Sequence, residues 1–154
     1  MKIVLGSDHR GFTAKEHIKS VITQLGHEFI DFGPKDNSPT DYPDIAYIAA
    51  TAVSKGEADR AILICGTGIG MCIAANKVKG IRAALCHDEL TAQISRHHND
   101  SNVLCLSGDM TGEVLLRKIV EAWLTTEFQG GRHQRRINKI SAIEKGDNPA
   151  DITS

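Results

Sequence analysis

Aromatic residues, prolines and long apolar runs are scarce in this 154-residue sequence, and neither sign of charge dominates. It contains one Trp, two Tyr, four Phe and four Pro. No apolar run approaches the roughly 18 residues of a membrane-spanning helix, and the N-terminus lacks the apolar core of a signal peptide. Because 18 Lys and Arg nearly balance 19 Asp and Glu, a general surface for nucleic acid or membranes is not expected. We therefore expect a cytoplasmic globular protein.

Cysteine is also sparse, and no two cysteines form a CxxC pair. The four are Cys65, Cys72, Cys86 and Cys105. Disulfides are not expected in a cytoplasmic chain, and this spacing suits no zinc site. Cys72, Cys86 and Cys105 are interpreted as reduced thiols of the core.

Short apolar runs alternate with amphipathic stretches along the whole chain. The predicted strands cover residues 2–5, 28–32, 61–65, 81–86 and 102–106. The run 61–65 is apolar throughout, as is typical of a central parallel strand covered on both faces. This alternation predicts one domain over residues 1–154, with a flexible tail from about residue 146. The predicted fold is a doubly wound α/β sheet of five parallel strands, in the order 2-1-3-4-5, with helices on both faces.

Ligands of such sheets bind beyond the carboxyl ends of the strands, where the strand order reverses. Here that point lies between the first and third strands, which are followed by Ser7-Asp8-His9-Arg10 and by Gly66-Thr67-Gly68-Ile69-Gly70. The glycine run matches neither the GxGxxG fingerprint nor the P-loop. It is either a tight turn or a loop whose N–H groups face an anion or a developing oxyanion.

Cys65 ends the third strand immediately before these amides. A thiolate is stabilised at such a position, so Cys65 is a candidate functional thiol, with a buried core thiol as the alternative. Further along, Arg132 and Arg136 lie four residues apart and share one helix face. They could hold a phosphate or form a solvated basic face.

Together these segments resemble the family of type B ribose-5-phosphate isomerases, which includes the galactose-6-phosphate isomerase subunits. The matching stretches are Ser7-Asp8-His9-Arg10-Gly11-Phe12, Thr40-Asp41-Tyr42-Pro43, Ile64-Cys65-Gly66-Thr67-Gly68-Ile69-Gly70, Ile73-Ala74-Ala75-Asn76-Lys77, Gly80-Ile81-Arg82-Ala83, His98-Asn99-Asp100-Ser101-Asn102-Val103-Leu104 and Gly130-Gly131-Arg132-His133. The resemblance covers residues 1 to about 145, and the motifs are specific as a set.

The resemblance implies isomerisation of ribose 5-phosphate and ribulose 5-phosphate through an enediol(ate), in the non-oxidative pentose phosphate pathway, without metal or cofactor. It implies three catalytic residues: Cys65 is the base, Thr67 lies beside the glycine-loop amides that hold the enediolate oxygen, and His98 assists ring opening. The implied substrate-binding residues are Asp8, His9, Gly66, Gly68, Ile69, Gly70, Asn99, Arg132 and Arg136. A homodimer is expected, in which His98 and Asn99 reach the Cys65 site of the partner.

One position departs from the family pattern. Asp109 stands where many relatives carry a phosphate-binding arginine, and Arg10 could supply the missing charge. An isomerase acting on allose 6-phosphate or galactose 6-phosphate, or one needing a second kind of subunit, is the alternative. A phosphoacceptor receiver module is set aside, because Cys65 occupies the position where a receiver has aspartate.

Overall fold

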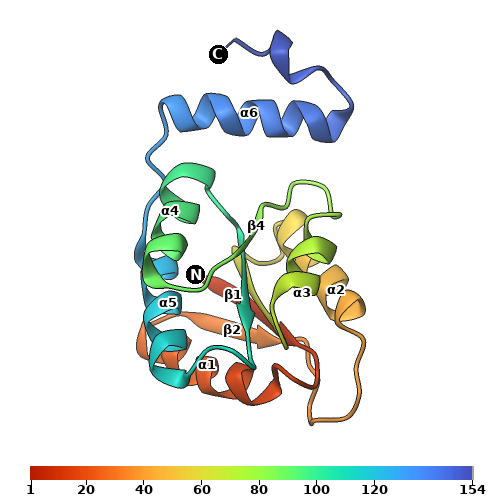
Figure 1. Cartoon of the computed structure of the whole chain (residues 1–154), viewed down its shortest axis with the longest axis vertical. Helices are drawn as coiled ribbons and strands as arrows, with labels where there is room; N and C mark the ends of the chain where they lie inside the picture. Colours follow the sequence, from red (N-terminus) through yellow and green to blue (C-terminus); the bar gives the residue numbers. More distant parts are fainter. Residues whose placement is uncertain (154) are drawn as a thin grey trace.

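The computed structural model describes residues 1–153 and contains a parallel sheet with helices on both faces (Figure 1). The strands are β1 (Lys2–Ser7), β2 (Glu28–Asp31), β3 (Arg60–Cys65), β4 (Ala83–Leu85) and β5 (Val103–Ser107). They lie in the order β2-β1-β3-β5-β4, and every neighbouring pair is parallel. The predicted class of fold, a doubly wound five-stranded parallel sheet, is confirmed.

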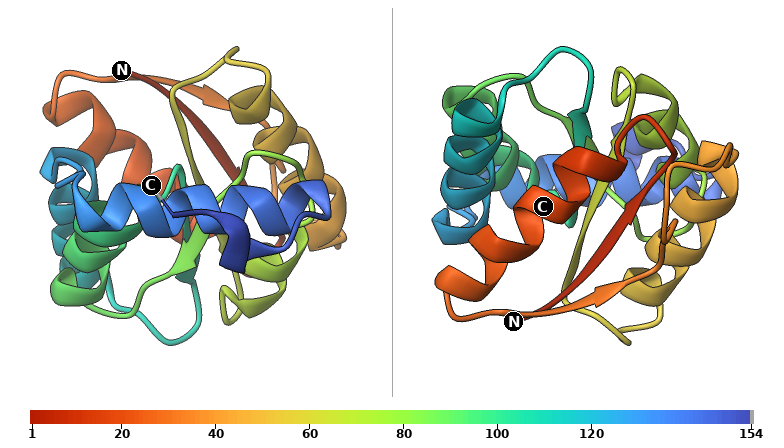
Figure 2. Two further views of the ribbon diagram at one scale, coloured as in Figure 1. Left: turned by 90° about the horizontal axis from the view of Figure 1, so that it is seen from above. Right: turned by 90° about the horizontal axis from the view of Figure 1, so that it is seen from below.

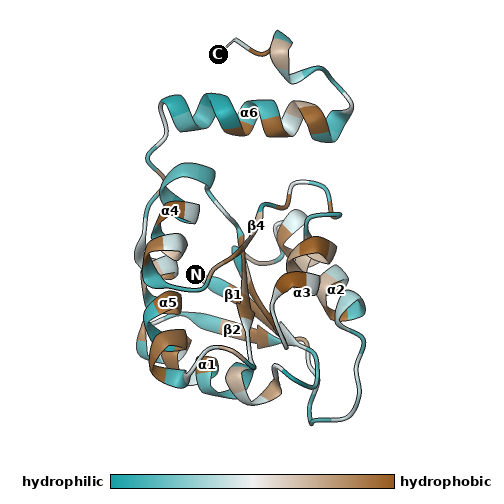
Figure 3. Ribbon diagram, in the orientation of Figure 1, coloured by the Kyte–Doolittle hydropathy of each residue, from teal (hydrophilic) through white to brown (hydrophobic). Residues whose placement is uncertain are grey.

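In the described part of the chain, five helices divide between the two faces of the sheet, and a sixth lies across one end of the molecule (Figure 1 and Figure 2). In chain order the helices are α1 (Phe12–Gln24), α2 (Tyr42–Ser54), α3 (Ile69–Ala75), α4 (Glu89–Asn99), α5 (Glu113–Thr125) and, at the end of the molecule, α6 (Arg132–Lys145), followed by a 3₁₀ turn at Pro149–Asp151. Helices α1, α4 and α5 form one buried apolar cluster with the sheet, and α2 and α3 form the other. Figure 3 shows the strong hydropathy of the central strands, as expected of strands covered on both faces. No helix within residues 1–153 is long and apolar enough to cross a membrane.

The predicted strand order 2-1-3-4-5 is wrong for its last two strands. β5 pairs with β3, as in the register of Ile62 with Leu104, and β4 lies at the sheet edge. Burial explains this exchange, because all five residues of β5 are buried whereas the three residues of β4 are only half-buried. Since crossovers between parallel strands are right-handed, the return from β4 to β5 puts α3 and α4 on opposite faces.

A buried lysine joins α1 to the end of β2. The Lys15 side chain is inaccessible to solvent, and its Nζ donates to both carboxylate oxygens of Asp31 at 2.7 Å and to the carbonyl of Pro34 at 2.7 Å. Burial alone would raise the pKa of Asp31, but hydrogen bonds from Lys15 and Lys19 outweigh it and hold that pKa below its ordinary value. This pair fixes the start of the loop that leads to α2 beside the candidate site.

Asp31→Ala is expected to lower the free energy of unfolding at neutral pH by about 3 kcal/mol, because the buried Lys15 ammonium loses its carboxylate. The pKa of Asp31 is depressed in the folded protein. Its stabilisation is therefore present above the unfolded value of about 3.9 and is lost as the pH falls through the folded pKa. Urea unfolding across this range should show the difference between variant and wild type shrinking below about pH 4.

The matched control is Glu16→Ala, which removes the more exposed carboxylate 3.4 Å from Lys15. It should cost less than about 1 kcal/mol. An equal loss in both variants, or a difference for Asp31→Ala that does not change with pH, would contradict the assignment.

Candidate active site

A cleft of about 560 Å³ opens at the carboxyl ends of β1, β3 and β5. Its lining consists of Asp8, Arg10, Tyr42, Cys65, Gly66, Thr67, Ile69, Gly70, Ile73 and Asp109. It lies where the strand order reverses between β1 and β3, which is the position that the sequence predicted. The cleft therefore brings together the loop after β1 and the glycine loop after β3.

Cys65 is the last residue of β3, and its side chain faces the start of α3. The residue is only 4% exposed, and its Sγ accepts a hydrogen bond from the Gly68 amide at 3.1 Å. Gly68 has a φ of +78°, and a Cβ there would lie 2.9 Å from the backbone of Leu106. Only glycine fits this turn, which therefore fixes an N–H donor directly on the sulfur of Cys65.

Gly66 and Gly70 in the same loop leave room for side chains that come from neighbouring elements. A Cβ on Gly70 would meet the ring of Tyr42 at 2.6 Å, and a Cβ on Gly66 would meet both Arg10 and Asp109. Tyr42 lies in the motif Thr40-Asp41-Tyr42-Pro43, but the sequence did not predict that it belongs to the site. The packing of Tyr42 on Gly70 places it in the cleft wall.

Asp8 and His9 occupy the turn between β1 and α1. The Asp8 side chain is buried, and its Oδ1 accepts the amides of Arg10 and Gly11, each at 2.9 Å. His9 Nδ1 accepts the amide of Thr40 at 3.3 Å, which ties this turn to the loop before α2. Asp8 lines the cleft directly, whereas His9 is adjacent to residues that line it.

Arg10 and Asp109 form an ion pair at the cleft. The Arg10 Nε and Nη2 each lie 2.7 Å from Asp109 Oδ2. The hydrogen bond and the charge of Asp109 raise the pKa of Arg10. Asp109, which departs from the family pattern, is therefore paired directly with Arg10, the residue that was expected to supply the missing positive charge. Both residues belong to the cleft wall.

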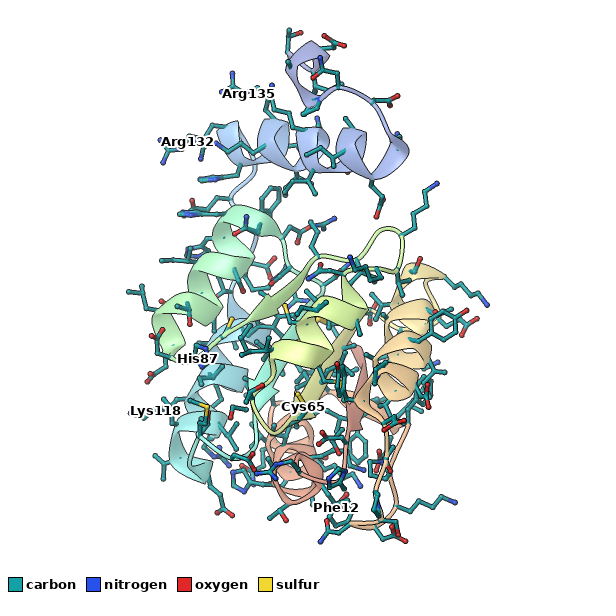
Figure 4. All side chains as sticks on the ribbon, turned by 45° about the vertical axis from the view of Figure 1, so that its right-hand side comes forward. Phe12, Cys65, His87, Lys118, Arg132 and Arg135 are labelled. Carbon is teal, nitrogen blue, oxygen red and sulfur yellow. The ribbon has the colours of Figure 1, made fainter. Side chains whose placement is uncertain are left out.

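A second group of candidate residues lies at the amino-terminal ends of the strands, opposite the cleft. His98 and Asn99 end α4, which precedes β5, whereas Cys65 follows β3. The His98 ring stacks on His133 at the start of α6, with 4.1 Å between ring centroids and an interplanar angle of 7°. Figure 4 shows Arg132, near this group, far from Cys65.

Basic side chains surround His133 at the start of α6. Desolvation lowers the pKa of His133, and so do nearby His98, Arg132 and Arg136. The structure thus divides the predicted site residues into the cleft around Cys65 and a basic group around His98, and one chain does not bring the two together.

The remaining cysteines lie outside the cleft. Cys86 and Cys105 are buried as predicted, and burial raises the pKa of both thiols, to about 11 for Cys86. Cys72 is only half-buried, and a hydrogen bond from Cys105 lowers the pKa of Cys72 to about 7. Its Sγ lies 3.5 Å from the carbonyl of Ala83, so it faces β4.

Comparison with known proteins finds similar sequences and similar solved structures. A family model described as Ribose/Galactose Isomerase matches residues 3–140. Ribose-5-phosphate isomerase B of Escherichia coli (strain K12) is 49% identical, over 94% of this chain and 97% of its own length. The structure of Clostridium thermocellum ribose-5-phosphate isomerase B superposes with a TM-score of 0.93 at 51% identity, over 95% of this chain and 99% of that one.

A third relative was solved with a ligand. Ribose-5-phosphate isomerase B of Mycoplasma genitalium, with bound ribulose-5-phosphate, has a TM-score of 0.90 and 46% identity to this chain, over 94% of this chain and 96% of that one. Sequence and structure are thus alike over nearly the full length of each relative. The chain belongs to the ribose/galactose isomerase family.

Proposed function

We propose that this protein interconverts ribose 5-phosphate and ribulose 5-phosphate, with Cys65 as the base, in the non-oxidative pentose phosphate pathway of the cytoplasm. The observation that carries the proposal is the Cys65 sulfur held 3.1 Å from the Gly68 amide in a cleft between β1 and β3. The ribulose-5-phosphate bound to the Mycoplasma genitalium relative supports the choice of substrate.

In this mechanism the Cys65 thiolate removes the proton from C2 of the open-chain aldose. The electron pair forms the C1–C2 double bond, and negative charge develops on O1, which the backbone N–H groups of the glycine loop stabilise. The thiol then returns the proton to C1, while the hydroxyl proton of C2 passes to O1. Thr67 Oγ1 accepts the Ile69 amide at 3.3 Å, which leaves its hydroxyl proton free for a substrate oxygen.

In the proposed site, His98, Asn99, Arg132 and Arg136 come from the partner subunit of a homodimer. Exposed apolar side chains around the cleft support this assembly, since Ile69 and Ile73 at its wall are 51% and 58% exposed. On α6, Ile140 and Ile143 are also exposed, and Figure 3 shows apolar residues along this helix. A second copy that covered the apolar wall could bring its basic group to the Cys65 cleft, with Arg132 and Arg136 on the phosphate.

The direct test is a panel of aldose phosphates, with ketose formation followed by NMR and with this chain as the only protein. Ribose 5-phosphate is expected to have a kcat/KM at least tenfold above allose 6-phosphate and galactose 6-phosphate, about 1.4 kcal/mol of transition-state preference. Activity is expected to survive exhaustive dialysis against a chelator. A preference for a hexose phosphate would overturn the substrate while leaving the reaction class intact.

Cys65→Ala is expected to abolish turnover while leaving the Kd for ribose 5-phosphate within a few-fold, because the thiolate acts mainly in the transition state. Cys72→Ala is the matched control, because Cys72 lies outside the cleft and a hydrogen bond from Cys105 lowers its pKa to about 7. Turnover assays and calorimetric titration measure both properties. Retention of most of the kcat in Cys65→Ala, or its loss in Cys72→Ala, would place the base elsewhere.

Shared sites are tested by complementation. Cys65→Ala and His98→Asn are each expected to be inactive as homodimers. After subunit exchange, a mixed dimer has one site built from the unmutated half of each chain, so part of the activity should return. Native mass spectrometry confirms the exchange. Absence of recovery in proven mixed dimers would place Cys65 and His98 in the site of one subunit.

A further inference from the structure

The last turn of α4 is held by a charged cluster that the proposed mechanism does not use. Asp100, which follows α4, has a left-handed backbone with φ 45° and ψ 47°. Its Oδ1 lies 2.8 Å from Arg96 Nη1, and its Oδ2 lies 3.0 Å from Arg82 Nη2. Arg96 itself is buried, with a side chain only 6% exposed. One carboxylate therefore lies between two guanidinium groups at the end of the helix that carries His98.

Arg82 also binds the backbone at this end of α4. Arg82 Nε donates to the carbonyls of Asn99 and Asp100, at 2.9 and 3.1 Å, and Arg82 Nη2 donates to the Asp100 carbonyl at 2.8 Å. The terminal carbonyls of a helix have no partner within the helix, so these bonds prevent the turn from fraying. The His97 carbonyl is also held, by the Gln129 amide at 3.1 Å.

The His98 ring is fixed separately from its backbone. It lies parallel to His133, 4.1 Å away, and His133 is only 4% exposed. A flat face at this distance restricts rotation of the His98 imidazole about its side-chain torsions. The backbone at His98 is thus held by residues of α4 and of the segment before β4, whereas the His98 ring is held by His133 of α6.

We infer that four positioning residues fix His98 for ring opening, namely Asp100, Arg82, Arg96 and His133. The inference rests on the proposed function, in which His98 assists opening of the sugar ring. A left-handed residue commonly ends a helix, and Asp and Asn adopt this conformation more readily than other residues with a side chain. Catalytic groups tolerate little displacement, since an error of about 1 Å can cost about 100-fold in rate.

The chemistry of the two sugar phosphates allows a selective test. Ribose 5-phosphate closes its C1 onto O4 and must be opened before the proton at C2 can be removed. Ribulose 5-phosphate stays open, because the O5 that would attack C2 carries the phosphate. Exchange of its C1 proton with deuterium from solvent therefore needs the Cys65 base but no ring opening.

The first variant is Asp100→Asn, which keeps the size of the side chain and tolerates the left-handed backbone. At saturating substrate, its kcat for ribose 5-phosphate is expected to fall by about tenfold or more, as for a misplaced acid–base group. Its rate of C1 exchange in ribulose 5-phosphate should stay within about threefold of wild type, because the Cys65 cleft is unchanged.

The second test is a pair of variants at His133, read by the same two assays. His133→Ala removes the stacked ring and should selectively lower ribose 5-phosphate turnover. His133→Phe restores a flat ring without a titratable nitrogen and should recover most of the loss. This pair decides the question if thermal melts show that Asp100→Asn does not fold.

Equal losses in both assays, no loss in either, or a His133→Phe variant no better than His133→Ala would overturn the inference. A wild-type protein that neither isomerises ribose 5-phosphate nor exchanges the C1 proton would instead contradict the proposed function.

Discussion

The candidate site depends on close backbone packing at the carboxyl end of β3. A Cβ on Gly11 would lie 2.4 Å from the carbonyl oxygen of Ile64, so the start of α1 packs directly on the end of β3. The amide of Gly108 meets the carbonyl of Cys65 at 2.8 Å from the other side. Between these two close neighbours, the chain after Cys65 leaves the sheet and enters α3 through the left-handed turn at Gly68. That turn brings an amide onto the sulfur.

Much of this arrangement could be predicted from the sequence because it depends on local signals. Apolar strands that alternate with amphipathic helices predict a doubly wound sheet, and the reversal between the first and third strands predicts the position of the cleft. The order of β4 and β5 could not be predicted, because right-handed crossovers allow both arrangements. Burial decides between them, and it depends on how helices from distant parts of the chain cover the sheet.

The contacts that sequence reasoning missed join residues far apart in the chain. Arg10 and Asp109 meet only because the ends of β1 and β5 flank β3. His98 stacks on His133 because the segment after α5 returns to the end of α4. Neither pair has a spacing or composition that marks it, and Tyr42 reaches the cleft only because Gly70 leaves room for its ring. Such pairings follow from tertiary structure alone.

The two outer strands have a consequence for how the protein can associate. β4 has three residues and β2 has four, and β2 ends at Asp31 among the charged groups of Lys15 and Lys19. Short, charged edges are poor templates for the addition of a strand from another chain. Continuous sheets, swapped strands and fibril-like stacking are therefore disfavoured. Assembly is left to the helical surfaces, where geometry rather than backbone hydrogen bonding selects the partner.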